Sequence, residues 1–356
     1  MTVENVIAAS ERGRLRWMDA LRGLAITMVV YLHSADSMSL KFEDLDPIFT
    51  QINGYFSPFR MPALMLLSGL LVAGSMRKGA GRYFKGKLSG ILYPYVIWSI
   101  ISYGLFIYRA HFNGKPVVEF WHSLFFEPMA YLWFIYYIFF YYVIAYFALR
   151  LHWSVSLLGS LALYLILKDT EFDRFIFHLP FFILGGVLGY HLEAFKQFVE
   201  RASWLAALAL AGLVTWYVMA WHGLVATGGA YQPISMVLAL AMTLVLLRIV
   251  TFKWMTSVLR PFEWFGRNSL VLFLVHFPVT WVAPVLLTRW VHGDPDTAFL
   301  AYFVGVMAIS SLAAVMNNRS RLVSLLFTAN VLLNRKASRQ VRQRSVMPAP
   351  FMGKPI

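Results

Sequence analysis

The chain has 356 residues, of which 59% are hydrophobic and only 13% are charged. A soluble domain carries about 25% charged residues, so this composition predicts a protein that crosses a membrane several times. The chain has no cysteine, which excludes disulfides, thiolate metal sites and a cysteine-linked acyl intermediate. The net charge of +14 would suit nucleic acid, but the basic residues are distributed between apolar segments in a way that argues against this partner.

Ten apolar segments predict an all-α, polytopic membrane protein, a bundle of about ten transmembrane helices. They are residues 18–37, 57–76, 88–108, 129–149, 153–168, 174–192, 203–221, 231–249, 267–288 and 297–317. With a cytoplasmic N-terminus, 23 of the 31 Lys and Arg residues lie on the inner side and six on the outer side. The positive-inside rule therefore predicts that both termini are cytoplasmic. Residues 1–334 form one membrane domain in this interpretation, and the basic segment 335–356 is expected to be a disordered cytoplasmic tail.

Two ionisable residues, Arg22 and His33, lie inside the first apolar segment. A charge at the bilayer centre costs about 2.5–3.5 kcal/mol on insertion scales, so such residues are candidates for function. Eleven residues are about three helical turns, which places both on one helix face with a rise of about 16 Å between them. Arg22 either forms an ion pair with Asp19 or holds an anionic phosphate in its guanidinium fork. His33 is either a satisfied core residue or a general base that accepts a proton near neutral pH.

Three further residues are candidates for substrate binding. Asp36 follows His33 by three residues, and it either orients the imidazole or begins the outer loop. Arg60 lies between Pro58 and Pro62, where it would bind substrate or an oxyanion, or extend to lipid headgroups. His276 lies two to three turns into its helix, at a depth comparable to that of His33, so the two histidines would share one cavity.

The loop 77–87 holds five basic residues, Arg77, Lys78, Arg82, Lys85 and Lys87. They either reflect topology and anionic lipid or contact the phosphates of a donor substrate. No residue group has metal-ligand spacing such as HExxH, and no nucleotide-binding or serine-hydrolase motif is present. The glycines of FFILGGVLG (181–189) are typical of close helix packing, and Trp133 is typical of a membrane-interface aromatic.

Six passages, taken together and in order, resemble the membrane-bound acyltransferase family 3, which includes bacterial O-acetyltransferases of polysaccharides and related glycans. They are RLRWMDALRGLAITMVVYLHS, FRMPALMLLSGLLV, the basic loop running into ILYPYVIW, YLWFIYYIF, LPFFILGGVLG and GRNSLVLFLVHFP, between residues 14 and 278. The resemblance implies transfer of an acyl group, usually acetyl, from cytoplasmic acyl-CoA to a hydroxyl of a sugar, polysaccharide or glycolipid at the outer face. It also implies a multi-pass protein of the bacterial plasma (inner) membrane, with acyl-CoA as co-substrate and no bound cofactor.

The family pattern makes Arg22 and His33 the essential catalytic pair. We expect His33 to act as general base on the acceptor hydroxyl, with Arg60 or His276 steadying the oxyanion or the acceptor. A covalent acyl-histidine step is equally compatible with the sequence. Many members have Arg-x-x-Arg where this chain has Lys87 and Gly90, so Lys85 or Arg82 would take over donor contacts. The alternative function is a secondary transporter of an anionic solute, with Arg22 and His33 as binding and proton-relay groups.

Overall fold

The computed structural model describes residues 15–42, 44–113, 119–225, 231–252, 254–287 and 294–332, and no strand occurs among them. The predicted tail 335–356 lies outside these residues. The first half of the chain forms α2 (Arg16–Ser39), α3 (Pro47–Gly69), α4 (Val72–Met76), α5 (Ala80–Lys87), the π-helical turn η1 (Leu88–Leu92), α6 (Tyr93–Asn113), α7 (Phe120–Phe125), the 3₁₀ turn η2 (Ala130–Leu132), α8 (Trp133–Ala148) and α9 (Trp153–Leu167). The second half forms α10 (Asp173–Tyr190), α11 (Leu192–Arg201), α12 (Ser203–Trp221), α13 (Pro233–Val250), α14 (Met255–Val258), α15 (Arg260–Arg267), α16 (Ser269–Leu287), α17 (Pro295–Arg319) and α18 (Arg321–Ser324).

Each of the ten predicted segments overlaps at least one helix, and the all-helical membrane bundle is confirmed. Six helices among the described residues are long and apolar enough to cross a membrane. The number is seven if α10 and α11, which are bent by 102° at their junction, count as one span. The helix α9 is apolar but shorter, as is Ser269–Val282 within α16. The count of ten and the cytoplasmic termini stay predictions.

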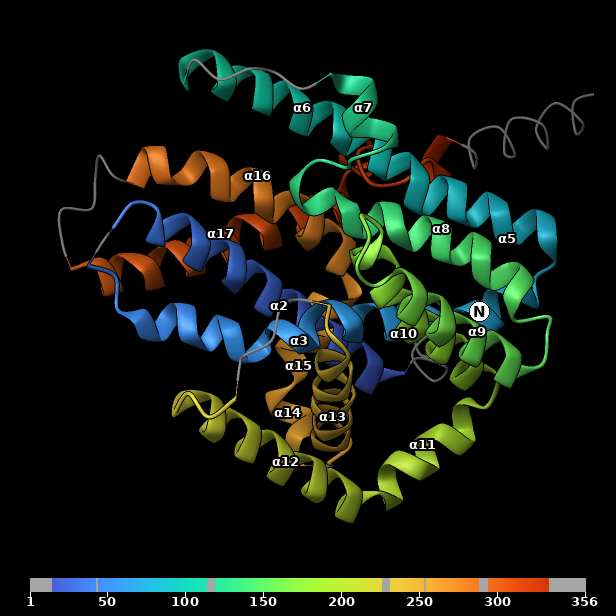
Figure 1. Ribbon diagram of the computed structural model, residues 1–356. Coiled ribbons are helices and arrows are strands. Elements are labelled where there is room, and N and C mark those ends of the chain that lie inside the picture. Colours follow the sequence, from blue (N-terminus) through green and yellow to red (C-terminus); the bar gives the residue numbers. More distant parts are fainter. Residues whose placement is uncertain are drawn as a thin grey trace, which may run out of the picture.

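Helix α2 lies in the interior of the bundle and packs against α3, α13, α15, α16 and α17 (Figure 1). The side chains of Leu21, Ala25 and Val30 on α2 are fully buried. The helix that carries Arg22 and His33 is therefore enclosed by protein rather than by lipid.

Two helix contacts depend on glycine, because the backbones touch. A methyl group on Gly69 of α3 would overlap the carbonyl oxygen of Phe182 on α10, and one on Gly185 of α10 would overlap the carbonyl of Leu66. A methyl group on Gly23 of α2 would likewise overlap the carbonyl of Phe262 on α15. Small residues allow this approach in membrane bundles. The packing role predicted for the glycines of segment 181–189 is confirmed at Gly185.

Aspartate and proline begin two of the long helices. Asp46 precedes Pro47 at the start of α3, and Asp294 precedes Pro295 at the start of α17. Each aspartate side chain accepts a backbone N–H bond of its own helix, from Ile48 in one case and from Thr297 in the other. This is the usual arrangement of an N-cap followed by proline in the first turn.

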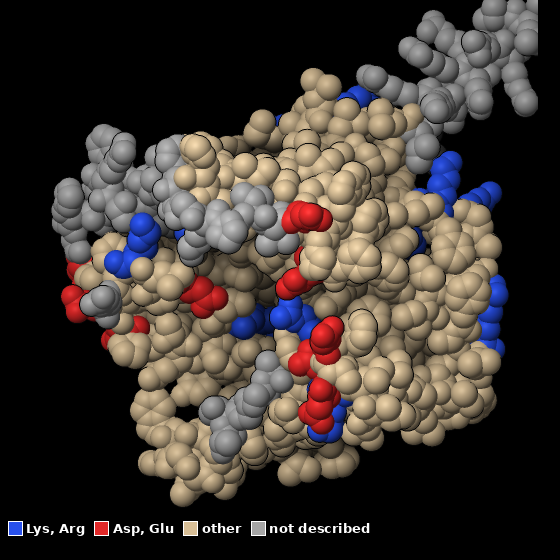
Figure 2. Space-filling model, turned by 45° about the horizontal axis from the view of Figure 1, so that its top comes forward, with Lys and Arg blue, Asp and Glu red and all other residues tan. Residues whose placement is uncertain are grey.

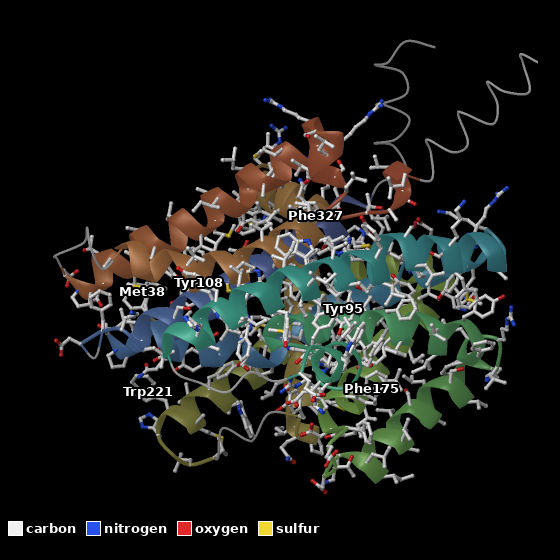
Figure 3. The ribbon with its side chains drawn as sticks, turned by 90° about the horizontal axis from the view of Figure 1, so that it is seen from above. Met38, Tyr95, Tyr108, Phe175, Trp221 and Phe327 are labelled. Carbon is white, nitrogen blue, oxygen red and sulfur yellow. The ribbon has the colours of Figure 1, made fainter. Side chains whose placement is uncertain are left out.

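The helix directions define two ends of the bundle. Met38 of α2, Tyr108 of α6 and Trp221 of α12 lie toward one end, which we call the His33 end; the other is the Arg22 end (Figure 3). Phe175, near the beginning of α10, lies between the two ends (Figure 3). Helices α8 and α9 are shorter than α2, with 16 and 15 residues compared with 24 in α2. The outline is hollowed on one face, where basic and acidic side chains gather (Figure 2).

Replacing Gly69 or Gly185 by alanine should lower the free energy of unfolding by at least about 1–3 kcal/mol, because two helix backbones must move apart. Gly104→Ala on α6 is the matched control, since no atom lies within 4 Å of the added methyl group. Thermal unfolding in detergent measures all three variants. Equal stability of the Gly69 and Gly104 variants would contradict the close contact of α3 with α10.

Candidate active site

The two predicted histidines lie together at the His33 end. The rings of His33 on α2 and His276 on α16 have centroids 5.3 Å apart. The His33 ring also contacts the Phe277 ring edge to face, with centroids 4.9 Å apart. His276 is fully buried, whereas His33 is half-buried. Two helices more than two hundred residues apart in sequence thus form one imidazole pair.

The hydrogen bond of His276 defines its tautomer. Its Nδ1 lies 3.1 Å from the carbonyl oxygen of Leu272, one helical turn earlier. A carbonyl oxygen only accepts, so Nδ1 carries the proton and Nε2 presents a lone pair. That Nε2 is buried and has no hydrogen-bond partner among the described residues. A buried acceptor without a partner is unusual in a folded protein, which makes His276 a candidate for function.

Proline explains why Tyr131 lies beside this pair. Pro278 has no N–H, so the carbonyl of Leu274, four residues earlier, lacks its helical partner. The Tyr131 hydroxyl donates to that carbonyl at 2.9 Å. The Tyr131 ring stacks on Phe277 with centroids 4.6 Å apart and meets the His276 ring at 5.7 Å. The proline two residues after His276 thus creates the acceptor that anchors Tyr131.

Arg60 lies inside the protein and not at the lipid surface. Its side chain is 5% exposed, and Nη1 donates to the backbone oxygen of Asn53 at 3.1 Å and to the Asn53 side-chain oxygen. The guanidinium is close enough to interact electrostatically with both His33 and Asp36. Asp36 is exposed at the last turns of α2. The four residues predicted at the point of transfer therefore lie close together. His33 and Asp36 are on α2, Arg60 is on α3 and His276 is on α16.

Arg22 and Tyr142 donate hydrogen bonds to neighbouring backbone carbonyls at the end of α3. Its Nη2 donates to the carbonyl of Leu67 at 3.3 Å, and the Tyr142 hydroxyl donates to the next carbonyl, that of Ser68, at 2.8 Å. The Lys87 ammonium lies 3.4 Å from the centroid of the Tyr142 ring and donates to the Ser75 hydroxyl at 3.3 Å. A cation over an aromatic face is attracted by its negative potential. Tyr142 thus lies between Arg22 and Lys87.

A cavity of about 930 Å³ opens at the Arg22 end. Its lining includes Arg77, Lys78, Lys87, Tyr190 and Met18. Met18 is one helical turn before Arg22 on α2, so the same face of α2 leads from this cavity toward His33. The volume is in the range of ligand sites. Its three cations outnumber its one carboxylate, that of Glu193, so the cavity is suitable for an anionic ligand with an apolar portion.

The predicted donor residues occupy different surroundings. Lys87 lines the cavity, whereas Arg82 and Lys85 are exposed and lie outside its lining. Gly79, with a positive φ of 84°, separates α4 from α5 and lies between the basic residues Lys78 and Arg82. At Gly90 no atom lies within 4 Å of an added methyl group, so the site of the missing arginine is open.

Three residues of the site were not predicted from the sequence: Tyr131, Tyr142 and Asn53. The sequence contains an indication only for Tyr131: Pro278 leaves the carbonyl of Leu274 without its helical partner, so another donor is expected there. The described residues contain no group of three or more His, Asp or Glu side chains that could hold a metal ion.

The sequence from residue 15 to residue 315 matches the acyltransferase domain family to which the membrane-bound acyltransferases of family 3 belong. The match covers most of the chain, and the protein is therefore a member of this family. It is a multi-pass membrane protein of an acyltransferase family.

Two relatives from Staphylococcus aureus, from strains MRSA252 and N315, are each 22% identical over 285 residues. The aligned part is 72% of this chain and 79% of the relative. Both relatives are named probable poly-beta-1,6-N-acetyl-D-glucosamine export protein. No solved structure matches the chain.

A double-mutant cycle tests whether Asn53 holds Arg60. Asn53→Ala and Arg60→Met should each lower stability, and the double variant should lose less than the sum, with a coupling of roughly 1–3 kcal/mol. Thermal or chemical unfolding in detergent gives the three differences. Strictly additive losses would show that the two side chains do not interact in the folded protein.

Proposed function

We propose that this protein is an integral membrane O-acyltransferase that moves an acetyl group from acyl-CoA to a hydroxyl of a cell-surface saccharide. One observation carries the proposal: helix α2 runs from a basic cavity, which Met18 lines one turn before Arg22, to the imidazole pair of His33 and His276. Membership of the acyltransferase family supports group transfer rather than binding alone.

The Arg22 end faces the cytoplasm in this proposal, and both termini are cytoplasmic. The distribution of Lys and Arg supports this orientation, with 23 on the inner side against six. The cavity is then open to cytoplasmic acyl-CoA, and the His33 end faces the outside of a bacterial inner membrane. Donor and acceptor approach α2 from opposite sides.

The cavity would hold the phosphates of acyl-CoA. Arg77, Lys78 and Lys87 supply the positive charge at its lining, and the position of Lys87 is fixed by Tyr142 and Ser75. Arg22 lies one turn deeper than Met18 and would guide the pantetheine arm or a phosphate with its guanidinium fork. The arm is the slender part of the donor, and it would extend along α2 toward His33.

The chemistry is then acid–base catalysis at His33. Neutral His33 accepts the proton of a sugar hydroxyl while the hydroxyl oxygen forms a bond to the thioester carbonyl carbon. The negative charge that develops on the carbonyl oxygen would be stabilised by the guanidinium of Arg60. The carbon–sulfur bond then breaks, and the thiolate of coenzyme A takes up the proton from His33. His276 accepts a hydrogen bond at its free Nε2, from His33 or from the acceptor.

The names of the relatives suggest the acceptor and a second function. A polymer of β-1,6-linked N-acetylglucosamine is the acceptor that we propose for testing. The same names favour one alternative, which is export of such a polymer without acylation. The two functions differ in whether the saccharide acquires an ester.

Replacing His33 by alanine should lower acetyl transfer by about 10²–10⁴-fold, because the general base is lost. Binding of acetyl-CoA should not change, since the cavity is at the other end of α2. Transfer of radiolabelled acetate to a β-1,6-linked N-acetylglucosamine oligosaccharide measures the first effect, and calorimetry of donor binding measures the second. Near-normal transfer by this variant would contradict the assignment of His33.

Lys87→Met should raise the KM for acetyl-CoA several-fold, because a fixed cation at the cavity lining is removed. Arg82→Met is the matched control, since Arg82 lies five residues earlier, is exposed and does not line the cavity. Initial rates at varied acetyl-CoA give both values. An effect of Arg82→Met as large as that of Lys87→Met would show that the donor binds outside this cavity.

A further inference from the structure

A second cluster of polar and aromatic side chains lies outside the site described above. The guanidinium of Arg174, at the start of α10, lies 5.3 Å from the ring centroid of Trp133 and 5.9 Å from that of Tyr231. Trp133 begins α8, and Tyr231 comes two residues before α13. Arg174 is exposed, and both rings are half-buried. The starts of three helices thus bring together the rings of Trp133 and Tyr231 and the cation of Arg174. No step of the proposed reaction uses these three side chains.

Buried groups hold the two rings in place. His178 is 2% exposed, and its Nδ1 lies 2.8 Å from the carbonyl of Arg174, so that the proton is on Nδ1. The His178 ring contacts Trp133 and Tyr231 at 5.4 and 5.8 Å between centroids. The Tyr164 hydroxyl donates to the carbonyl of Tyr231 at 2.8 Å. The rings are therefore fixed before any ligand arrives.

The backbone is strained where the cluster is built. Ala130 and Tyr231, with φ of 44° and 71°, are the non-glycine residues of the described chain with positive φ. Such a conformation costs about 1–3 kcal/mol, and it persists where surrounding structure enforces it, often at binding sites. For a bulky residue such as tyrosine it is rare. One of these residues belongs to the cluster, and the other lies three residues before Trp133.

The cluster is linked to the imidazole pair through the short segment that begins α8. Tyr131, two residues before Trp133, packs on His276 and Phe277. In this segment, Tyr131 faces the proposed point of transfer and Trp133 contacts Arg174. Phe175, which follows Arg174, lies between the two ends of the bundle (Figure 3).

We propose that Trp133, Tyr231 and Arg174 form a subsite for a pyranose ring of the acceptor saccharide, beside the ring that is acylated. The apolar C–H face of a pyranose stacks on an aromatic ring, and its hydroxyls accept hydrogen bonds from a guanidinium. Glu171 and Asp173 precede Arg174 within three residues, and this negative charge disfavours a polyanionic glycan. The subsite therefore fits an uncharged sugar such as an N-acetylhexosamine. This inference rests on the proposed function for the identity of the acceptor.

Binding without donor tests the subsite. The probe is a β-1,6-linked N-acetylglucosamine pentasaccharide, titrated calorimetrically into the full-length protein in lipid nanodiscs. Trp133→Ala should weaken its binding up to about tenfold, and Trp133→Phe should retain most of the affinity because a flat ring remains. Trp121→Ala on α7 is the control, since it removes the same type of side chain from an exposed position where Trp121 stacks on Phe125 rather than on this cluster. Acetyl-CoA affinity should be equal in all variants.

Arg174→Gln gives a second measurement at an exposed position, in case Trp133→Ala does not fold. It should weaken pentasaccharide binding without changing the melting temperature. Unchanged affinity in both Trp133→Ala and Arg174→Gln, or no binding by the unaltered protein, would overturn the subsite. A protein that binds the pentasaccharide through this cluster but transfers no acetyl group would instead contradict the proposed function and leave the subsite standing.

Discussion

The structure depends on one kind of interaction, the hydrogen bond from a polar side chain inside the bundle to a backbone carbonyl. Within a membrane, water is not available to satisfy such groups, so the protein must supply the partner. Arg22 donates to Leu67, Tyr131 donates to Leu274, and His276 donates to Leu272. Each bond fixes a side chain in one orientation. These side chains are therefore held in place without a substrate, and such preorganisation favours electrostatic stabilisation of a transition state.

Helix α2 links the two ends of the molecule because it lies inside the bundle. Its close contact with α15 at Gly23 and its packing against α16 fix both Arg22 and His33 relative to the rest of the protein. The two residues are separated by about 16 Å of helix rise. In our account this separation is functional, since a cytoplasmic donor and an external acceptor must meet without opening a path for other solutes.

The sequence predicted the helical segments well, because long apolar runs have few alternatives. It also predicted that His33 and His276 lie close together, because both are at a similar depth in their helices. The sequence did not predict the rotation of each helix about its own axis. It did not predict which basic residues of the loop line the cavity, because the left-handed Gly79 and the π-helical turn after Lys87 decide which way a side chain faces. Tyr142 was missed for a related reason: in an aromatic-rich helix such as α8, no local pattern distinguishes a functional tyrosine from a packing one.

The central claim is that acyl transfer occurs across the membrane along α2. The most direct measurement uses sealed vesicles that contain the purified protein, with radiolabelled acetyl-CoA only inside and a β-1,6-linked N-acetylglucosamine oligosaccharide only outside. Molecules with the Arg22 end facing the lumen would catalyse the reaction. Our account predicts labelled ester on the external oligosaccharide. External oligosaccharide that stays unlabelled while the vesicles remain sealed would contradict it.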